Sequence, residues 1–140
     1  MTNRSMGEIV RRQNPVCLPA TATVQEACRA MRDRRVGAIL VTGADGRLVG
    51  LFTGRDAVTR VGADARDPAA TTLEQVMTRN PDITHPGTRA IEVLRQMSDA
   101  GYRHLPIVDE GRIVGIVSKG DFLGLERARH DDETGFWEIM

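Results

Sequence analysis

Residues 47–56 read RLVGLFTGRD, and residues 112–121 read RIVGIVSKGD. Both stretches contain, in one order, a glycine, two apolar residues, a hydroxyl residue, two variable residues and an aspartate. The aliphatic part ends at the hydroxyl, so we interpret each stretch as a strand that passes into a helix. The doubling indicates that the chain contains two copies of one structural unit.

The repeat extends well beyond this stretch. Upstream of it, residues 66 positions apart match repeatedly, as in the steps Asn14-Pro15 and Asn80-Pro81. One residue is then dropped and the offset becomes 65, which aligns Asp56 with Asp121. Chance matches would not keep one offset with one gap, so the chain is a tandem duplication. The predicted boundaries are 5–62 for the first unit, 63–71 for the linker, 72–126 for the second unit and 127–140 for a C-terminal tail.

Each unit is expected to have the element order α-β-α-β-β-α. An amphipathic helix is indicated by apolar residues at helical spacing from Val24 in one copy and from Ala90 in the other. Thr23 and Glu26 predict a capping box at the first of these helices, and the second copy has no equivalent pair. The other expected elements are opening helices (5–12 and 71–78), extended pieces (16–18 and 82–84), hairpins (38–53 and 104–118) and final helices after Thr53 and Ser118. The fold class is therefore α+β (α/β sandwich-like), with two small sheets covered by helices and a pseudo-twofold axis relating the units.

Composition and charge exclude several classes of protein. Nineteen basic residues balance nineteen acidic ones, which gives no general attraction to nucleic acid or to an anionic membrane. Cys17 and Cys28 are the only cysteines, too few for a disulfide framework or a zinc site. The N-terminus lacks a signal-peptide pattern, and the longest apolar run, 36–41, is too short to span a bilayer. We expect a cytoplasmic protein without membrane insertion.

The shared motif has a physical interpretation. The hydroxyls of Thr53 and Ser118 stand where helix caps belong, and the following first-turn N–H groups suit a phosphate. Asp56 and Asp121 can accept hydrogen bonds from ribose hydroxyls, and the glycine lets a flat ring approach the backbone. The alternative is that the motif only caps a helix.

The motif resembles the ribose-phosphate motif of the CBS domain family, and the resemblance covers about residues 5–126. Two such units in tandem form a Bateman module, which typically holds adenosine-containing ligands such as AMP, ADP, ATP, S-adenosylmethionine or NAD in the cleft between the units. The resemblance implies that Asp56 and Asp121 bind ribose. It assigns ribose or phosphate to Thr53 and Ser118.

The same resemblance implies further site residues. Arg103 and His104 match a segment that faces the phosphates, Arg55 matches a phosphate-side arginine, and Lys119 adjoins the equivalent position in the second copy. The adenine side is expected at Leu18 and Thr84, with Ile39 and Ile107 as apolar walls. Because the first copy has Gly37-Ala38 where the second has Arg103-His104, our hypothesis is that Arg55, Arg103 and His104 converge on one polyphosphate.

The expected function is a regulatory module that binds an adenine nucleotide and passes its occupancy to a regulated partner that the sequence does not identify. No catalytic motif or metal-ligand spacing is present, so we expect neither an enzyme nor a metal requirement. A homodimer is expected, because a module of two small units leaves apolar helix faces exposed. The alternative is a ligand-independent dimerisation or interaction scaffold.

Overall fold

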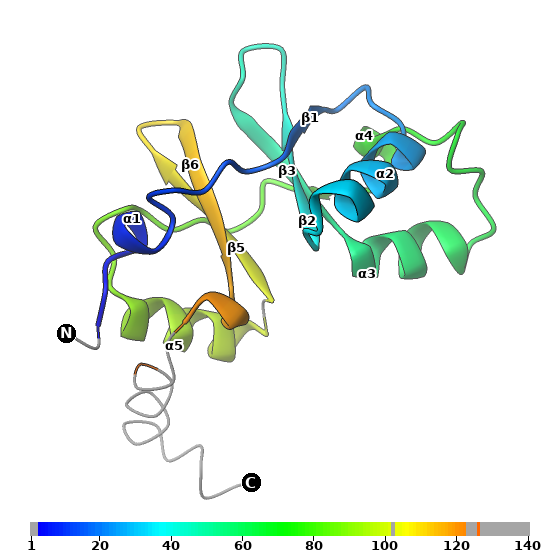
Figure 1. Cartoon of the computed structure of the whole chain (residues 1–140). Coiled ribbons are helices and arrows are strands. Elements are labelled where there is room, and N and C mark those ends of the chain that lie inside the picture. Colours follow the sequence, from blue (N-terminus) through cyan, green and yellow to red (C-terminus); the bar gives the residue numbers. More distant parts are fainter. Residues whose placement is uncertain (1–2, 102, 123–125, 127–140) are drawn as a thin grey trace, which may run out of the picture. The chain divides into compact units, whose positions relative to one another are not determined.

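The computed structural model of the chain describes residues 3–101, 103–122 and 126. They divide into two compact units, which we describe separately. The central unit is residues 14–81, and the terminal unit combines the described residues of 1–13 and of 82–140. Each packing unit contains the hairpin of one sequence repeat and the opening helix of the other (Figure 1).

The central unit has a four-stranded sheet in the order β1-β2-β3-β4, with β1 parallel to β2 and the other pairs antiparallel. A hairpin turn with Gly46 at φ 80° joins β2 to β3. The elements of the central unit are β1 (Cys17–Pro19), α2 (Val24–Arg34), β2 (Ala38–Thr42), β3 (Leu48–Thr53), α3 (Gly54–Asp56), the π-helix η1 (Ala57–Gly62), α4 (Leu73–Val76) and β4 (Thr78–Arg79).

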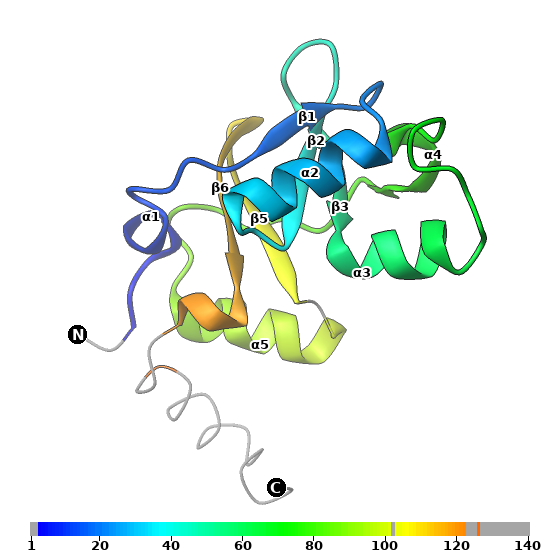
Figure 2. The same cartoon turned by 45° about the vertical axis from the view of Figure 1, so that its right-hand side comes forward.

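The terminal unit has the antiparallel hairpin β5–β6, whose tight turn places Glu110 and Gly111 at positive φ. Thr84 forms a parallel bridge with Ile107, in the position that β1 occupies beside β2. Helix α5 packs against the hairpin (Figure 2). The elements are α1 (Met6–Ile9), α5 (Ala90–Ala100), β5 (His104–Asp109), β6 (Arg112–Ser118) and the 3₁₀ turn η2 (Lys119–Asp121).

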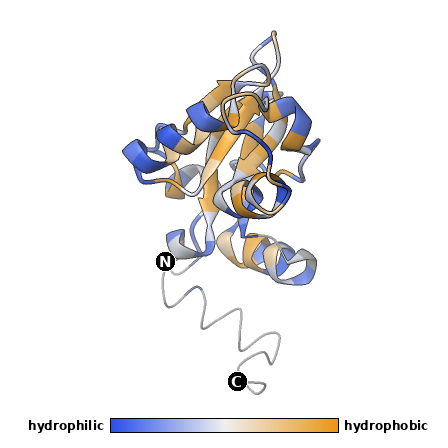
Figure 3. Ribbon diagram, turned by 90° about the vertical axis from the view of Figure 1, so that its right-hand side faces the viewer, coloured by the Kyte–Doolittle hydropathy of each residue, from blue (hydrophilic) through white to orange (hydrophobic). Residues whose placement is uncertain are grey.

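Each unit has its own aliphatic core. In the central unit, Val24, Ala27 and Met31 of α2 pack against strands β2 and β3, with Phe52 as the one buried aromatic of that cluster. In the terminal unit, the apolar face of α5 packs against Leu105, Ile107 and Val117. Figure 3 shows the strands mostly in hydrophobic colours, whereas the helices carry both colours, as expected when one helix face is buried.

The motif glycines allow the opening helices to pack closely on the sheets. A Cβ at Gly50 would lie 2.3 Å from the sulfur of Met77, which follows α4. A Cβ at Gly115 would lie 2.9 Å from Cβ of Val10, which follows α1. Our interpretation of these glycines as an approach for a flat ring is therefore corrected: a packed side chain occupies that space in both units.

The hairpins and the two amphipathic helices agree with the sequence prediction to within a few residues. Thr23 caps α2 by accepting the Glu26 N–H at 3.1 Å, and Arg89 at the start of α5 makes no side-chain cap. The opening helices are shorter than expected, at four residues each. The final helices are the short α3 with η1 in one copy and the single turn η2 in the other.

The packing units do not coincide with the repeats read from the sequence. Helix α1 belongs by sequence to the first repeat but packs in the terminal unit, and α4 packs in the central unit. The expected linker 63–71 is part of the central unit, where Thr71 is buried and its carbonyl accepts the N–H of Val24. The predicted tail 127–140 lies outside the described residues. Among those residues, no helix has the length and apolar composition needed to cross a bilayer.

Candidate functional site

The first copy of the motif forms a closed hydrogen-bonded loop at the end of β3. The N–H of Thr53 donates to Oδ2 of Asp56 at 2.9 Å, and the N–H of Asp56 donates to Oγ1 of Thr53 at 3.2 Å. The N–H of Gly54 donates to the carbonyl of Gly37 at 3.0 Å. Because these amides already have acceptors, a phosphate at this motif would depend mainly on side chains such as the exposed Arg55.

The second copy repeats the arrangement at the end of β6. The N–H of Ser118 donates to Oδ2 of Asp121 at 2.7 Å, and its hydroxyl lies 3.3 Å from the same oxygen. Both copies therefore cap the helix or turn that follows, as the capping alternative requires. Capping uses mainly Oδ2. Oδ1 of Asp56 lies 3.5 Å from Nε of Arg60, and a carboxylate oxygen has two lone pairs, so each Oδ1 leaves acceptor capacity for a hydroxyl group.

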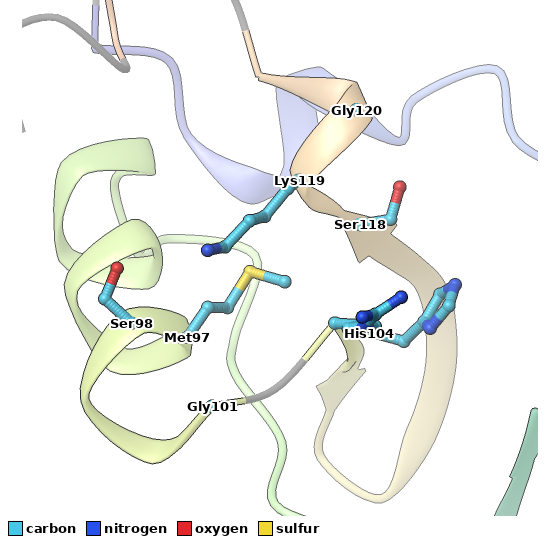
Figure 4. A pocket seen from close by; sticks show the side chains of 8 residues that line it. Met97, Ser98, Gly101, His104, Ser118, Lys119 and Gly120 are labelled. Atoms are coloured by element: carbon cyan, nitrogen blue, oxygen red, sulfur yellow. The ribbon is translucent and has the colours of Figure 1, made fainter. Parts of the chain in front are cut away.

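A cavity of about 500 Å³ lies beside the second motif, within the terminal unit. Figure 4 shows Lys119 extending from η2 across this cavity toward α5, where Met97 and Ser98 lie. His104 is paired directly opposite Ser118 in the hairpin. The lining residues are Met97, Ser98, Gly101, Arg103, His104, Ser118, Lys119 and Gly120. The cavity thus combines two cationic side chains, an imidazole and two hydroxyls, a set suited to an anion.

The charge of His104 responds to this environment. Burial lowers the pKa of the His104 imidazole, the Asp121 carboxylate opposes that shift, and the Arg103 guanidinium adds to it. The neutral ring is therefore favoured in the ligand-free protein. A bound phosphate would favour the protonated ring instead.

The lowered pKa of His104 predicts how stability depends on pH. The unfolded chain takes up the proton at its ordinary pKa, near 6.5, before the folded protein does, so the free energy of unfolding should fall as the pH drops below that value. Urea unfolding between pH 7.5 and 5 should show a smaller loss for His104→Gln than for the wild type. Identical pH profiles for the two proteins would contradict this assignment.

The residues expected on the adenine side lie in two kinds of location, at the edges of the hairpins and in the cores. Leu18 lies on β1 beside Val41, and Thr84 bridges to Ile107, so these two occupy equivalent edges of the hairpins. Ile39 and Ile107 have no exposed surface and belong to the two cores. Contact of these isoleucines with an adenine ring therefore stays a prediction.

The structure brings together only part of the expected site. Arg103, His104, Ser118 and Lys119 share one cavity, and Asp121 ends the same turn. Arg55 belongs to the central unit, so its convergence with Arg103 and His104 on one polyphosphate stays a prediction. In the part of the chain that the structure describes, no three His, Cys, Asp or Glu side chains are grouped closely enough to hold a metal ion.

Two arginines next to the motifs were not identified from the sequence. Arg60 Nε lies 3.5 Å from Oδ1 of Asp56, a pair four residues apart that helical spacing could have revealed. Arg4 binds the buried carboxylate of Glu126 and donates from Nη2 to the carbonyl of Asp121 at 3.0 Å. Arg4 and Glu126 are 122 positions apart, and no local pattern links them.

Known proteins share this sequence and this fold. CBS domain-containing protein CBSCBSPB1 of Arabidopsis thaliana is 36% identical over 108 residues, which cover 77% of this chain and 20% of the relative. This chain thus spans about a fifth of the length of that relative.

Solved structures match over nearly the whole chain. An uncharacterised conserved protein of Pyrococcus horikoshii is 32% identical with a TM-score of 0.77, covering 90% of this chain and 93% of that one. A CBS domain protein of Pyrobaculum aerophilum, solved in complex with AMP, is 24% identical with a TM-score of 0.82, covering 91% and 98%. The family model of the CBS domain matches residues 6–63 and again residues 73–127. The chain therefore belongs to the CBS domain family and carries two copies of the domain in tandem.

Proposed function

We propose that the chain is a regulatory sensor that binds an adenosine-containing nucleotide and transmits its occupancy to a partner protein. The observation that carries the proposal is the cavity beside Ser118, where Arg103, His104 and Lys119 line one space next to the Asp121 carboxylate. Cationic groups and a carboxylate at adjacent positions match the two ends of a nucleoside phosphate. The first ligand to test is AMP, because a protein of the same fold was solved with it.

The side chains of the cavity and of the second motif divide between the phosphate and the ribose of the nucleotide. Arg103 can hold phosphate oxygens through two parallel N–H bonds, and Lys119 supplies a point charge. His104 donates once it is protonated beside the phosphate. Asp121 accepts from the ribose hydroxyls through acceptor capacity that capping leaves available, and Ser118 lies beside the same sugar. Asp56, Thr53 and Arg55 form the corresponding set of the first copy.

Binding should be visible as added stability. A nucleotide present at 100 times its dissociation constant should raise the apparent free energy of unfolding by about 2.7 kcal/mol. Thermal shift with AMP, ADP, ATP, NAD and S-adenosylmethionine identifies the ligand, and calorimetry gives its affinity. Turnover of a nucleotide by the purified protein would instead indicate an enzyme.

Arg103→Ala should weaken nucleotide binding about tenfold or more, because a charge-assisted pair with phosphate is lost. The matched control is Arg112→Ala, which removes an exposed arginine on β6 that does not line the cavity. Calorimetry should show unchanged affinity for Arg112→Ala. Equal affinities of Arg103→Ala and the wild type would exclude the assigned phosphate role.

A ligand-independent scaffold is the second candidate function. It is favoured by the capping boxes, which give Thr53, Ser118 and both aspartates structural partners without any ligand. Val58, 67% exposed on η1, offers an apolar contact for a second copy of the chain. Light scattering should report a homodimer under either candidate function, whereas a folded dimer that binds none of the five nucleotides would favour the scaffold.

A further inference from the structure

Arg60 connects the first motif to a helix of the other sequence repeat. Its Nε lies 3.5 Å from Oδ1 of Asp56, and its Nη1 donates to the carbonyls of Val76 and Met77 at 3.1 and 3.2 Å. One guanidinium thus contacts the motif carboxylate and the C-terminal end of α4 together. Arginine side chains commonly satisfy the last carbonyls of a helix, and the planar group can hold two acceptors in a fixed relation.

Helix α4 and the residues that follow it lead out of the central unit. Helix α4 is followed by β4, which pairs with β3 through Gly50–Arg79 and Leu51–Thr78. The chain then leaves the central unit after Pro81 and enters the terminal unit at Asp82. A change at the carbonyls of Val76 and Met77 is therefore close to one of the two covalent connections between the units, the one at Pro81–Asp82.

We propose that Arg60 is a positioning residue that couples the Asp56 carboxylate to α4, so that a nucleotide on Asp56 alters the segment 76–81. The inference rests on the proposed function and adds a route by which occupancy leaves the site. A ribose hydroxyl that engages Asp56 changes the balance between the two contacts of Arg60. The ordering of the α4 carbonyls changes with it.

The terminal unit contains a comparable connection. Arg4, which stands just before α1, donates to the backbone carbonyl of Asp121. Each motif aspartate is thus linked through an arginine to the opening helix that packs in the same unit. The two links differ in one respect: Arg60 contacts the carboxylate itself, whereas Arg4 contacts only the backbone of Asp121. We therefore expect that binding of a ligand to the aspartate carboxylate affects the opening helix at the first motif.

Hydrogen exchange of the 140-residue chain, with and without AMP, tests this coupling. In the ligand-free protein, Arg60→Ala should raise exchange at the amide of Met77, which follows α4 and donates to the carbonyl of Leu73, the first residue of that helix. In the wild type, AMP should change exchange across residues 73–81. In Arg60→Ala that response should disappear, while AMP still binds about three- to tenfold more weakly. Arg60→Lys should recover part of the response, because it keeps the charge beside Asp56.

The matched control is Arg66→Ala, which removes an exposed arginine of the same unit whose backbone N–H bonds to Val61. It should leave both the ligand-free exchange and the AMP response unchanged. A change in exchange across residues 73–81 on AMP binding that persists in Arg60→Ala would overturn the coupling. Unchanged exchange at the Met77 amide in ligand-free Arg60→Ala would show that Arg60 does not stabilise the end of α4. Failure of all five nucleotides to bind the wild type in calorimetry would overturn the proposed function, and the coupling with it.

Discussion

Arg4→Ala should lower the free energy of unfolding by about 3–5 kcal/mol, because it removes the cation that pairs with the buried carboxylate of Glu126. Glu126 has no exposed side-chain surface, and Arg4 binds both of its oxygens, with Nη2 at 2.9 Å and Nε at 3.2 Å. The backbone N–H of Arg4 adds a third bond at 2.9 Å. The hydrogen bond to Glu126 is also the main reason why the pKa of Arg4 is raised.

Urea unfolding of matched variants separates this effect from ordinary surface electrostatics. Arg89→Ala removes an exposed pair with Glu8, at 3.6 Å, and should change stability far less than Arg4→Ala, because solvent screens exposed ion pairs. The double variant Arg4→Ala with Glu126→Gln should recover stability relative to Arg4→Ala alone, since a neutral amide is easier to bury than a carboxylate that has lost the Arg4 guanidinium. A loss below about 1 kcal/mol for Arg4→Ala would contradict the buried ion pair.

Gly115→Val should destabilise the protein by about 3 kcal/mol, because α1 cannot keep its place against a β-branched side chain. The first carbon added would lie 2.7 Å from Oε1 of Gln13 and 2.9 Å from Cβ of Val10. Gln13 also binds the edge of β6 like an added strand, donating to the Ile116 carbonyl at 2.8 Å and accepting its N–H at 2.6 Å. Moving α1 away would break both of these bonds.

Urea unfolding should rank Gly115→Ala between the wild type and Gly115→Val. Gly87→Ala is the matched control in the same unit, because nothing lies within 4 Å of the carbon it adds. Equal stabilities of Gly115→Val and Gly87→Ala would show that α1 does not pack on β6 in solution. The assignment of α1, which belongs to the first repeat, to the terminal unit would then be wrong.

The hairpins and the long helices could be predicted because their signals are local. Aliphatic runs around a glycine-containing turn define β5 and β6, and a helical period of apolar residues defines α2 and α5. The packing of α1 and α4 could not be predicted in this way. A four-residue helix has no period long enough to show which sheet it covers, and only the tertiary contacts at Gly50 and Gly115 decide that.

The candidate site also contains residues that local sequence signals predict and contacts that only the tertiary structure shows. The motif residues Thr53 and Asp56 stand out because they recur at one register, and the hairpin pairing places His104 opposite Ser118. The contact between Arg4 and Glu126 joins opposite ends of the sequence, so no local pattern could reveal it. The capping role was predictable from the Thr-to-Asp spacing, whereas the cavity shape depends on side chains of α5 that the motif does not include.

Calorimetric titration of the purified 140-residue chain with AMP, ADP, ATP, NAD and S-adenosylmethionine tests the central claim most directly, with Asp121→Ala and Arg112→Ala measured in parallel. The account predicts saturable binding of at least one of these nucleotides, lost or weakened about tenfold or more in Asp121→Ala and unchanged in Arg112→Ala. Thermal unfolding of each variant without ligand establishes that the protein titrated is folded. Binding of none of the five by the folded wild type, or equal binding by Asp121→Ala, would contradict it.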